Sequence, residues 1–215
     1  MTKNHPMTTF LKKHLIWILL LGTLIGLNET LVGSMHLPFR SVLLSCTLLL
    51  ILVLGRYLIP KPGTSLLIVG VAVLFKVNNL GCHHACSSAE LLCGPAAVML
   101  MGVCFELLAS LLVWRSKSRF FAYALLTALA ALTAFGLFAL MNTYLLKSWD
   151  VQRLSEYILL KGSLTALFSS ALTVPLIWLA DRLKGRSLSE MNAWLAKGAA
   201  GLCIIVLWLF GSFYL

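Results

Sequence analysis

Long apolar runs separated by short polar breaks organise the whole chain. They predict seven spans, at about 14–34, 41–60, 64–80, 90–114, 120–146, 156–183 and 198–215. A helix that crosses a bilayer needs about 20 largely apolar residues, so the third and seventh runs are the shortest candidates. Strands of a transmembrane barrel would instead alternate apolar and polar residues. We therefore expect an all-α polytopic transmembrane helix bundle of six to seven spans, with residues 1–215 forming one domain.

Composition supports this prediction and excludes several classes of soluble protein. Of the 215 residues, 60% are hydrophobic and only 11% are charged. A water-facing surface needs far more charge than this, so a soluble enzyme, a secreted disulfide module and a DNA-binding domain are excluded. The net charge of +10 would suggest nucleic acid in a soluble protein. Here we expect membrane lipid and no nucleic acid as partner, and we interpret the charge as a signal for membrane orientation.

Lysine and arginine divide unevenly between the two sides of the predicted bundle. With a cytoplasmic N-terminus, the inside set is Lys3, Lys12, Lys13, Arg56, Lys61, Arg115, Lys117, Arg119, Arg182, Lys184, Arg186 and Lys197. The outside set is Arg40, Lys76, Lys147, Arg153 and Lys161. Cytoplasmic loops carry the excess of basic residues in membrane proteins. The expected location is therefore the inner (cell) membrane, with several spans and the N-terminus in the cytoplasm.

One stripe of the first predicted span combines small residues with two ionisable ones. Its members follow offsets of 4, 3, 4 and 3, which keeps them on one helical face: Gly22, Gly26, Glu29, Gly33 and His36. The Gly22-x-x-x-Gly26 pair permits close approach by a neighbouring helix. A carboxylate on such a packing face is costly unless it is paired or used. For Glu29 we predict an ion pair with Lys76, at similar depth in the third span, or a contact with a ligand, and the two can coexist.

The densest cluster of chemically active side chains is Cys82-His83-His84-Ala85-Cys86, in the predicted outer loop after the third span. Thiolate and neutral imidazole are good ligands for zinc, copper, iron or haem iron. An oxidising compartment could instead join Cys82 and Cys86 in a disulfide, and buried thiols can be inert. No second Cys-x-x-Cys pair and no Cys-x-x-Cys-His haem attachment sequence accompanies the cluster. Its candidate cofactors are a transition metal or haem, and the three interpretations stay open.

The fourth predicted span continues the pattern of soft donors. Five residues recur at helical spacing on one face: Glu90, Cys93, Ala97, Met101 and Cys104. Cys46, early in the second span, lies at a similar predicted depth. Glu106 is a further intramembrane acid, too far from the outer end to pair with Lys76, and we expect it to approach the inner half of another helix. Its role is either functional or one of bundle packing.

Motifs for enzymatic chemistry are missing from the sequence. It contains no Walker A loop, no Gly-x-Ser-x-Gly and no His-Glu-x-x-His. The chain is therefore not expected to be an enzyme, and any transport driven by ATP would need separate subunits.

Several stretches of the N-terminal half resemble the substrate-binding S components of energy-coupling-factor (ECF) transporters. They are Gly26-Leu-Asn-Glu-Thr-Leu-Val-Gly33, His36-Leu-Pro-Phe-Arg40, Lys61-Pro-Gly-Thr-Ser65, Leu74-Phe-Lys76, Cys93-Gly-Pro95 and Phe105-Glu106-Leu107. The resemblance implies capture of a vitamin or metal ion at the outer face, and docking onto a transmembrane coupling subunit that works with ATPase subunits. By this similarity Gly22 and Gly26 are docking candidates. A seventh span and the Cys/His cluster depart from the usual family plan.

The sequence as a whole predicts a membrane-embedded binding component of an uptake transporter. Its substrate would be a metal ion or a metal-containing cofactor, captured at the outer face. The residues expected to bind it are Glu29, His36, Cys82, His83, His84 and Cys86, the last four being the candidate metal ligands. Two alternatives remain: a membrane redox or haem-handling protein that uses the same cluster, and a structural subunit of a larger membrane complex.

Overall fold

The computed structural model describes residues 6–34, 39–80, 88–112, 119–146 and 149–185. Regular structure in these ranges is helical, and they contain no strand. The elements are α1 (Pro6–Ser34), α2 (Arg40–Leu58), α3 (Thr64–Leu80), α4 (Ser88–Leu112), α5 (Arg119–Leu140), η1 (Met141–Leu145), α6 (Val151–Glu156), η2 (Tyr157–Gly162) and α7 (Ser163–Gly185). The labels η1 and η2 denote π-helical segments, which continue α5 and join α6 to α7. The all-α prediction is confirmed for the described residues.

The helices follow the predicted spans closely. Five helical stretches are long and apolar enough to cross a membrane: His14–Val32, Arg40–Leu58, Gly94–Leu112, Phe120–Tyr144 and Val151–Arg182. The apolar stretch of α3, Thr64–Val77, is shorter, as expected for the third span. The seventh predicted span, 198–215, lies outside the described residues. Five of the first six predicted spans therefore correspond to helices that are long and apolar enough for a membrane bundle, and the number of spans stays a prediction.

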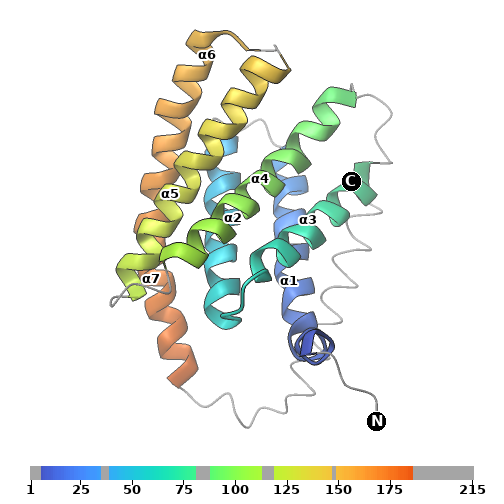
Figure 1. Cartoon of the computed structure of the whole chain (residues 1–215), viewed down its shortest axis with the longest axis vertical. Helices are drawn as coiled ribbons and strands as arrows, with labels where there is room; N and C mark the ends of the chain where they lie inside the picture. Colours follow the sequence, from blue (N-terminus) through green and yellow to red (C-terminus); the bar gives the residue numbers. More distant parts are fainter. Residues whose placement is uncertain (1–5, 35–38, 81–87, 113–118, 147–148, 186–215) are drawn as a thin grey trace.

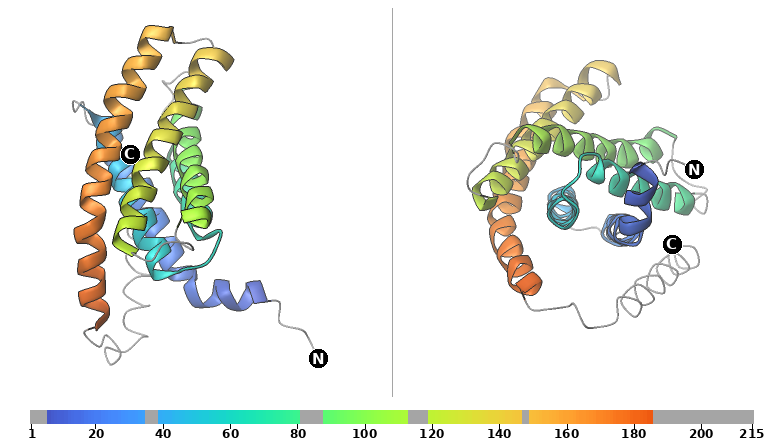
Figure 2. Two further views of the ribbon diagram at one scale, coloured as in Figure 1. Left: turned by 60° about the vertical axis from the view of Figure 1, so that its left-hand side comes forward. Right: turned by 60° about the horizontal axis from the view of Figure 1, so that its bottom comes forward.

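Successive long helices run in alternating directions (Figure 1). The first residues of α1, α3 and α5 therefore lie near the same end of the bundle as the last residues of α2, α4 and α7. Helix α2 is central: it contacts α1, α3, α4, α5 and α7, and the view along the bundle in Figure 2 shows α4, α5 and α7 curving around it. Its Leu49, Leu52 and Val53 are fully buried. Large apolar side chains such as Leu107 and Leu167, on α4 and α7, are exposed and suit contact with lipid.

Close packing of α1 against α3 depends on two glycines. A β-carbon added to Gly22 would lie 2.6 Å from the backbone oxygen of Ile68, and one added to Gly26 would lie 2.6 Å from Cδ1 of Phe75. Both distances are far shorter than any contact that folded proteins tolerate, so a side chain at either position would push the helices apart. The close approach predicted for this glycine pair is present, and the neighbouring helix is α3 of the same chain.

The turn between α2 and α3 is held by a buried ion pair. Glu106 Oε1, on α4, lies 3.3 Å from the Arg56 guanidinium of α2, and the two side chains are only 10% and 4% exposed. The same carboxylate accepts backbone N–H groups from Gly63 at 2.8 Å and Ser65 at 3.2 Å. Gly63 has φ of 84°, a left-handed conformation that favours glycine. Glu106 therefore caps the start of α3. It pairs with Arg56 and not with Lys76, in agreement with the prediction that Glu106 lies too far from the outer end to reach Lys76.

Candidate functional site

A pocket opens between five elements of the bundle, and we call it the interhelical pocket. Its cavity volume is about 50 Å³, and α1, α2, α4, α5 and η2 form its walls. Its lining comes from the last third of α1 and from the first halves of α2 and α4. Because the helices alternate in direction, these parts share one half of the bundle, the upper half in Figure 1.

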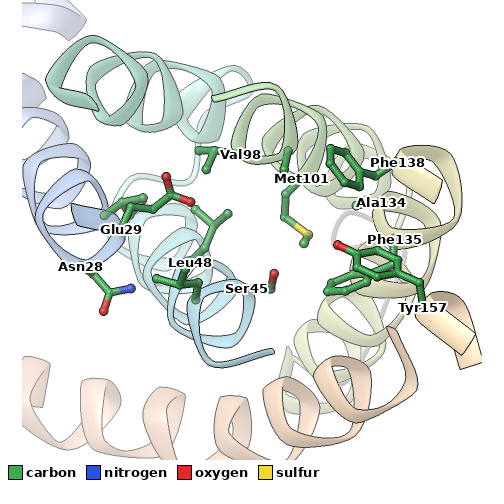
Figure 3. A pocket seen from close by; sticks show the side chains of 13 residues that line it. Asn28, Glu29, Ser45, Leu48, Val98, Met101, Ala134, Phe135, Phe138 and Tyr157 are labelled. Atoms are coloured by element: carbon green, nitrogen blue, oxygen red, sulfur yellow. The ribbon is translucent and has the colours of Figure 1, made fainter. Parts of the chain in front are cut away.

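Polar groups gather on one side of the interhelical pocket. Asn28 and Glu29 come from α1 and Ser45 comes from α2 (Figure 3). The Asn28 amide donates a hydrogen bond of 2.6 Å to Thr47 Oγ1, which joins α1 to α2 and fixes the orientation of the amide. Glu29 is the one acidic residue among the lining residues, and its side chain is 14% exposed. This side of the pocket can therefore accept hydrogen bonds and balance a positive charge.

Aromatic side chains form the opposite wall (Figure 3). Phe135 and Phe138 lie one turn apart on α5, and the Tyr157 ring of η2 lies 5.1 Å and 6.1 Å from them, centroid to centroid. Trp149 extends the cluster, 4.8 Å from Tyr157. Gly162 lets η2 approach α5, because a β-carbon there would lie 3.3 Å from Cβ of Phe135. The π-helical turn of η2 thus presents Tyr157 to the pocket, and π turns often mark functional sites.

The floor between the two walls is apolar and contains one sulfur atom. Ala97, Val98 and Met101 of α4 line it, together with Leu48 of α2. Ala97 and Met101 belong to the α4 face on which soft donors were predicted. The thioether of Met101 is polarizable and packs well against aromatic groups. The third described member of that face, Cys104, is buried and does not line the pocket.

Glu29 is paired with Lys76, so the predicted ion pair is confirmed. Lys76 Nζ donates to Glu29 Oε2, and the Lys76 side chain is 20% exposed. The ammonium group lies directly against Gly94 of α4, in space that any side chain at this position would fill. Glu29 and Lys76 also share a narrow gap in the packing between α1, α3 and α4, which has no room for a water molecule. Glu29 therefore lies between the interhelical pocket and Lys76, which holds it from the side away from the aromatic wall.

The remaining predicted site residues have different outcomes. His36, Cys82, His83, His84 and Cys86 lie outside the described residues, so the metal interpretation and the disulfide interpretation stay predictions. Within the described part of the chain, no group of three or more His, Cys, Asp or Glu side chains is arranged to hold a metal ion. The two docking candidates, Gly22 and Gly26, are buried beneath α3.

Two described cysteines are buried in the bundle with free thiols. Cys46 Sγ lies 3.7 Å from the Thr165 carbonyl oxygen, so it faces α7, while its neighbour Ser45 faces the interhelical pocket. Cys104 is buried among core side chains. Neither forms part of the pocket wall. Both fit the interpretation of small, inert core residues for these two positions.

Sequence reasoning missed the aromatic wall and the role of Ser45. Phe135 and Phe138 have the spacing of one helical turn, but in an apolar helix that spacing is common and carries no specific signal. Tyr157 belongs to a different element, and only the fold brings it to the same cavity. Asn28 was part of the stretch that suggested the family resemblance, yet nothing in its spacing distinguished a pocket residue from a packing residue.

The walls of the interhelical pocket define the chemistry that the site can perform. One carboxylate, one amide and the Ser45 hydroxyl face three aromatic rings across an apolar floor, and Tyr157 adds a second hydroxyl on the aromatic side. This set can bind and orient a small molecule by hydrogen bonds and ring contacts. Comparison of the chain with protein-family models, with curated proteins and with solved structures gives no match.

Proposed function

We propose that this chain is the membrane-embedded binding component of an uptake transporter, and that it captures a small organic molecule. The observation that supports this most directly is the interhelical pocket. It combines the polar side chains of Asn28, Glu29 and Ser45 with an aromatic wall inside a bundle of apolar helices. Ligand sites in proteins are typically concave and mostly apolar, with a few polar groups that orient the ligand.

The proposed orientation places the pocket in the outer half of the bundle. The sequence assigns twelve basic residues to the side predicted to be cytoplasmic and five to the other, which favours a cytoplasmic N-terminus. In that orientation, Glu29 lies in the outer half of α1, and the pocket belongs to the outer half of the bundle. The proposal is therefore that the pocket takes its ligand from the external medium.

Energy for transport would come from other subunits. The chain contains no phosphate-binding loop of the Walker A type, so it has no usual means of hydrolysing ATP. The resemblance to S components of ECF transporters supplies the partners of the proposal, a transmembrane coupling subunit and ATPase subunits. In that arrangement this chain would bind the substrate, and the other subunits would use ATP to drive transport.

The described walls favour an organic ligand over a bare metal ion. A bound metal ion needs four or more donor atoms at close range. The described pocket wall offers one carboxylate, and that group already binds Lys76. A metal-containing cofactor remains part of the proposal through the Cys82–Cys86 cluster, whose contribution stays a prediction.

Recovery of the natural ligand tests the proposed function. The protein would be produced in a bacterial host, purified in nanodiscs and denatured, and the released small molecules and metals would be identified by mass spectrometry. Ala97→Phe fills the floor of the pocket, whereas Ala171→Phe makes the same change at an exposed position of α7. We expect a bound molecule in the wild type and in Ala171→Phe, and its loss from Ala97→Phe.

Two results would contradict the proposal. One is a purified protein with no ligand that also binds nothing from a cell extract. The other is equal ligand content in the two phenylalanine variants. An absorption spectrum of the same sample distinguishes the alternative class, because a Soret band would identify a haem-handling protein instead.

A further inference from the structure

We infer that the interhelical pocket selects a positively charged organic molecule, and that the Lys76 ammonium takes the place of this charge when no ligand is bound. The inference rests on the proposed function and adds the charge of the ligand to it. Its basis is the position of one carboxylate between the interhelical pocket and the Lys76 ammonium. Binding would exchange one cation for another at Glu29, and Lys76 would be released.

Glu29 is placed to serve either cation. Glu29 lines the interhelical pocket, whereas Lys76 is not one of its lining residues. Lys76 therefore reaches the carboxylate from the side away from the pocket, across the packing gap that the two residues share. A ligand in the interhelical pocket therefore meets the carboxylate without first meeting the lysine. No large movement of a helix is needed for the exchange.

The opposite wall also suits a cation. Phe135, Phe138 and Tyr157 present aromatic rings across the pocket from Glu29 (Figure 3). Ring faces attract ammonium groups and cationic heterocycles, and aromatic cages of this kind bind quaternary ammonium ligands. A carboxylate on one side and aromatic faces on the other therefore favour a positive charge over a neutral or negative one. A neutral ligand would gain only apolar contact from the same rings.

Lys76 has a route out of its ion pair. It lies near the far end of α3, its side chain is 20% exposed, and its ammonium group is carried on a flexible four-carbon stem. Lysines near helix ends extend toward the membrane surface and keep their charge in water. When Lys76 pairs with Glu29, the empty pocket contains no unbalanced carboxylate. That balance matters because an unpaired charge inside a membrane protein is costly.

Gly94 makes the paired state possible. A β-carbon at this position would overlap the Lys76 ammonium and would lie 3.1 Å from its Cε atom. Gly94→Ala should therefore move Lys76 away from Glu29 while leaving both charges in the protein. Gly136→Ala is its matched control, since a β-carbon at Gly136 meets no atom within 4 Å.

Two probes of the same shape and different charge test the inference. They are the 4-(trimethylammonio)phenol cation and neutral 4-tert-butylphenol, in which carbon replaces the quaternary nitrogen. Affinities would be measured by ligand-observed NMR in nanodiscs, counting only binding that Ala97→Phe abolishes. We expect the wild type to prefer the cation by about tenfold or more, the effect of one charge-assisted contact.

Substitutions in the ion pair make the test specific. Lys76→Met removes the competitor of the cation and should raise the affinity for the cation by about tenfold. Gly94→Ala displaces only the flexible end of Lys76, so its gain should be smaller, and both variants should leave the affinity for the neutral probe unchanged. Glu29→Gln should lower the affinity for the cation to that for the neutral probe. In Glu29→Gln combined with Lys76→Met, the gain from Lys76→Met should disappear. Gly136→Ala should behave like the wild type.

Chemical labelling gives a measurement on the wild type alone. Acetylation of Lys76 by an amine-reactive reagent, quantified by peptide mass spectrometry, should increase when the cationic probe is added and not when the neutral probe is added. Equal affinity for the two probes, binding of neither, or unchanged labelling at saturating cation would each overturn the inference. The proposed function is judged separately, by the natural ligand recovered from the wild type and from Ala97→Phe.

Discussion

Glu106→Ala is expected to destabilise the bundle strongly, because one carboxylate connects α4 to two other parts of the chain. It pairs with Arg56 of α2 and accepts the N–H groups of Gly63 and Ser65 at the start of α3. The alanine variant would leave a guanidinium that is 4% exposed without its counter-charge. It would also leave two backbone donors without their acceptor.

The magnitude follows from the burial of both partners. Removing one partner of a buried ion pair costs about 3–5 kcal/mol, because the other charge remains buried and uncompensated. Arg56→Met should cost less than Glu106→Ala, since the carboxylate would keep the N–H donors of Gly63 and Ser65. Combining Arg56→Met with Glu106→Leu should recover part of the loss, because an apolar pair can replace a buried ion pair at little cost.

Unfolding by SDS in mixed micelles, followed by circular dichroism, measures this difference in free energy. A loss of about 3–5 kcal/mol lowers the ratio of folded to unfolded protein by about 10² to 10⁴. Glu156→Ala is the control, because Glu156 is exposed on α6, and its effect should stay within about 0.5 kcal/mol. A Glu106→Ala protein within about 1 kcal/mol of the wild type would refute the assigned role of the carboxylate.

Two other substitutions and one labelling experiment test the packing of the bundle. Gly22→Ala should lower the free energy of unfolding by about 1–3 kcal/mol in the same assay, because its β-carbon collides with α3. Gly136→Ala should be close to neutral, and equal effects of the two substitutions would contradict the packing. Phe135→Ala should cost about 3–5 kcal/mol, since the 3% exposed ring fills the space between α5 and η2, and a much smaller loss would count against that contact. Cys46 and Cys104 are each 6% exposed. Their labelling by a maleimide, measured peptide by peptide, should therefore be slow in the folded protein and fast in SDS. Rapid labelling before unfolding would disprove their burial.

Hydropathy predicted the helices well because the signal is local. An apolar run of about 20 residues is visible in the sequence whatever its neighbours are. The Glu29–Lys76 pair was also predictable, since intramembrane charges are rare and these two have matching depth. The glycine stripe of α1 predicted a close neighbour in the same way. Each of these predictions needed only the sequence of one helix or the membrane depths of two residues.

The rest of the site depends on which helices are neighbours, and hydropathy carries no such information. Arg56 could not be assigned to Glu106 before the α2–α3 turn was placed against α4. The aromatic wall needs α5 and η2 side by side, and Tyr157 reaches it through a π-helical turn that a regular helical period does not predict. The glycine stripe likewise did not reveal that α3 is the helix it accommodates.

The short apolar stretch of α3 has a consequence for the surrounding lipid. Thr64–Val77 is about 21 Å long at about 1.5 Å per residue, whereas the hydrocarbon core of a typical bilayer is about 30 Å thick. Backbone hydrogen bonds from Gly63 and Ser65 to Glu106 tie the start of α3 to α4, and the Lys76–Glu29 ion pair ties its other end to α1. Leu74 and Val77 are exposed, so one side of this helix is available to acyl chains. If α3 spans the bilayer as predicted, local thinning or flanking side chains that extend to the surface would accommodate the mismatch, and membrane thickness becomes a variable that acts on the helix carrying Lys76.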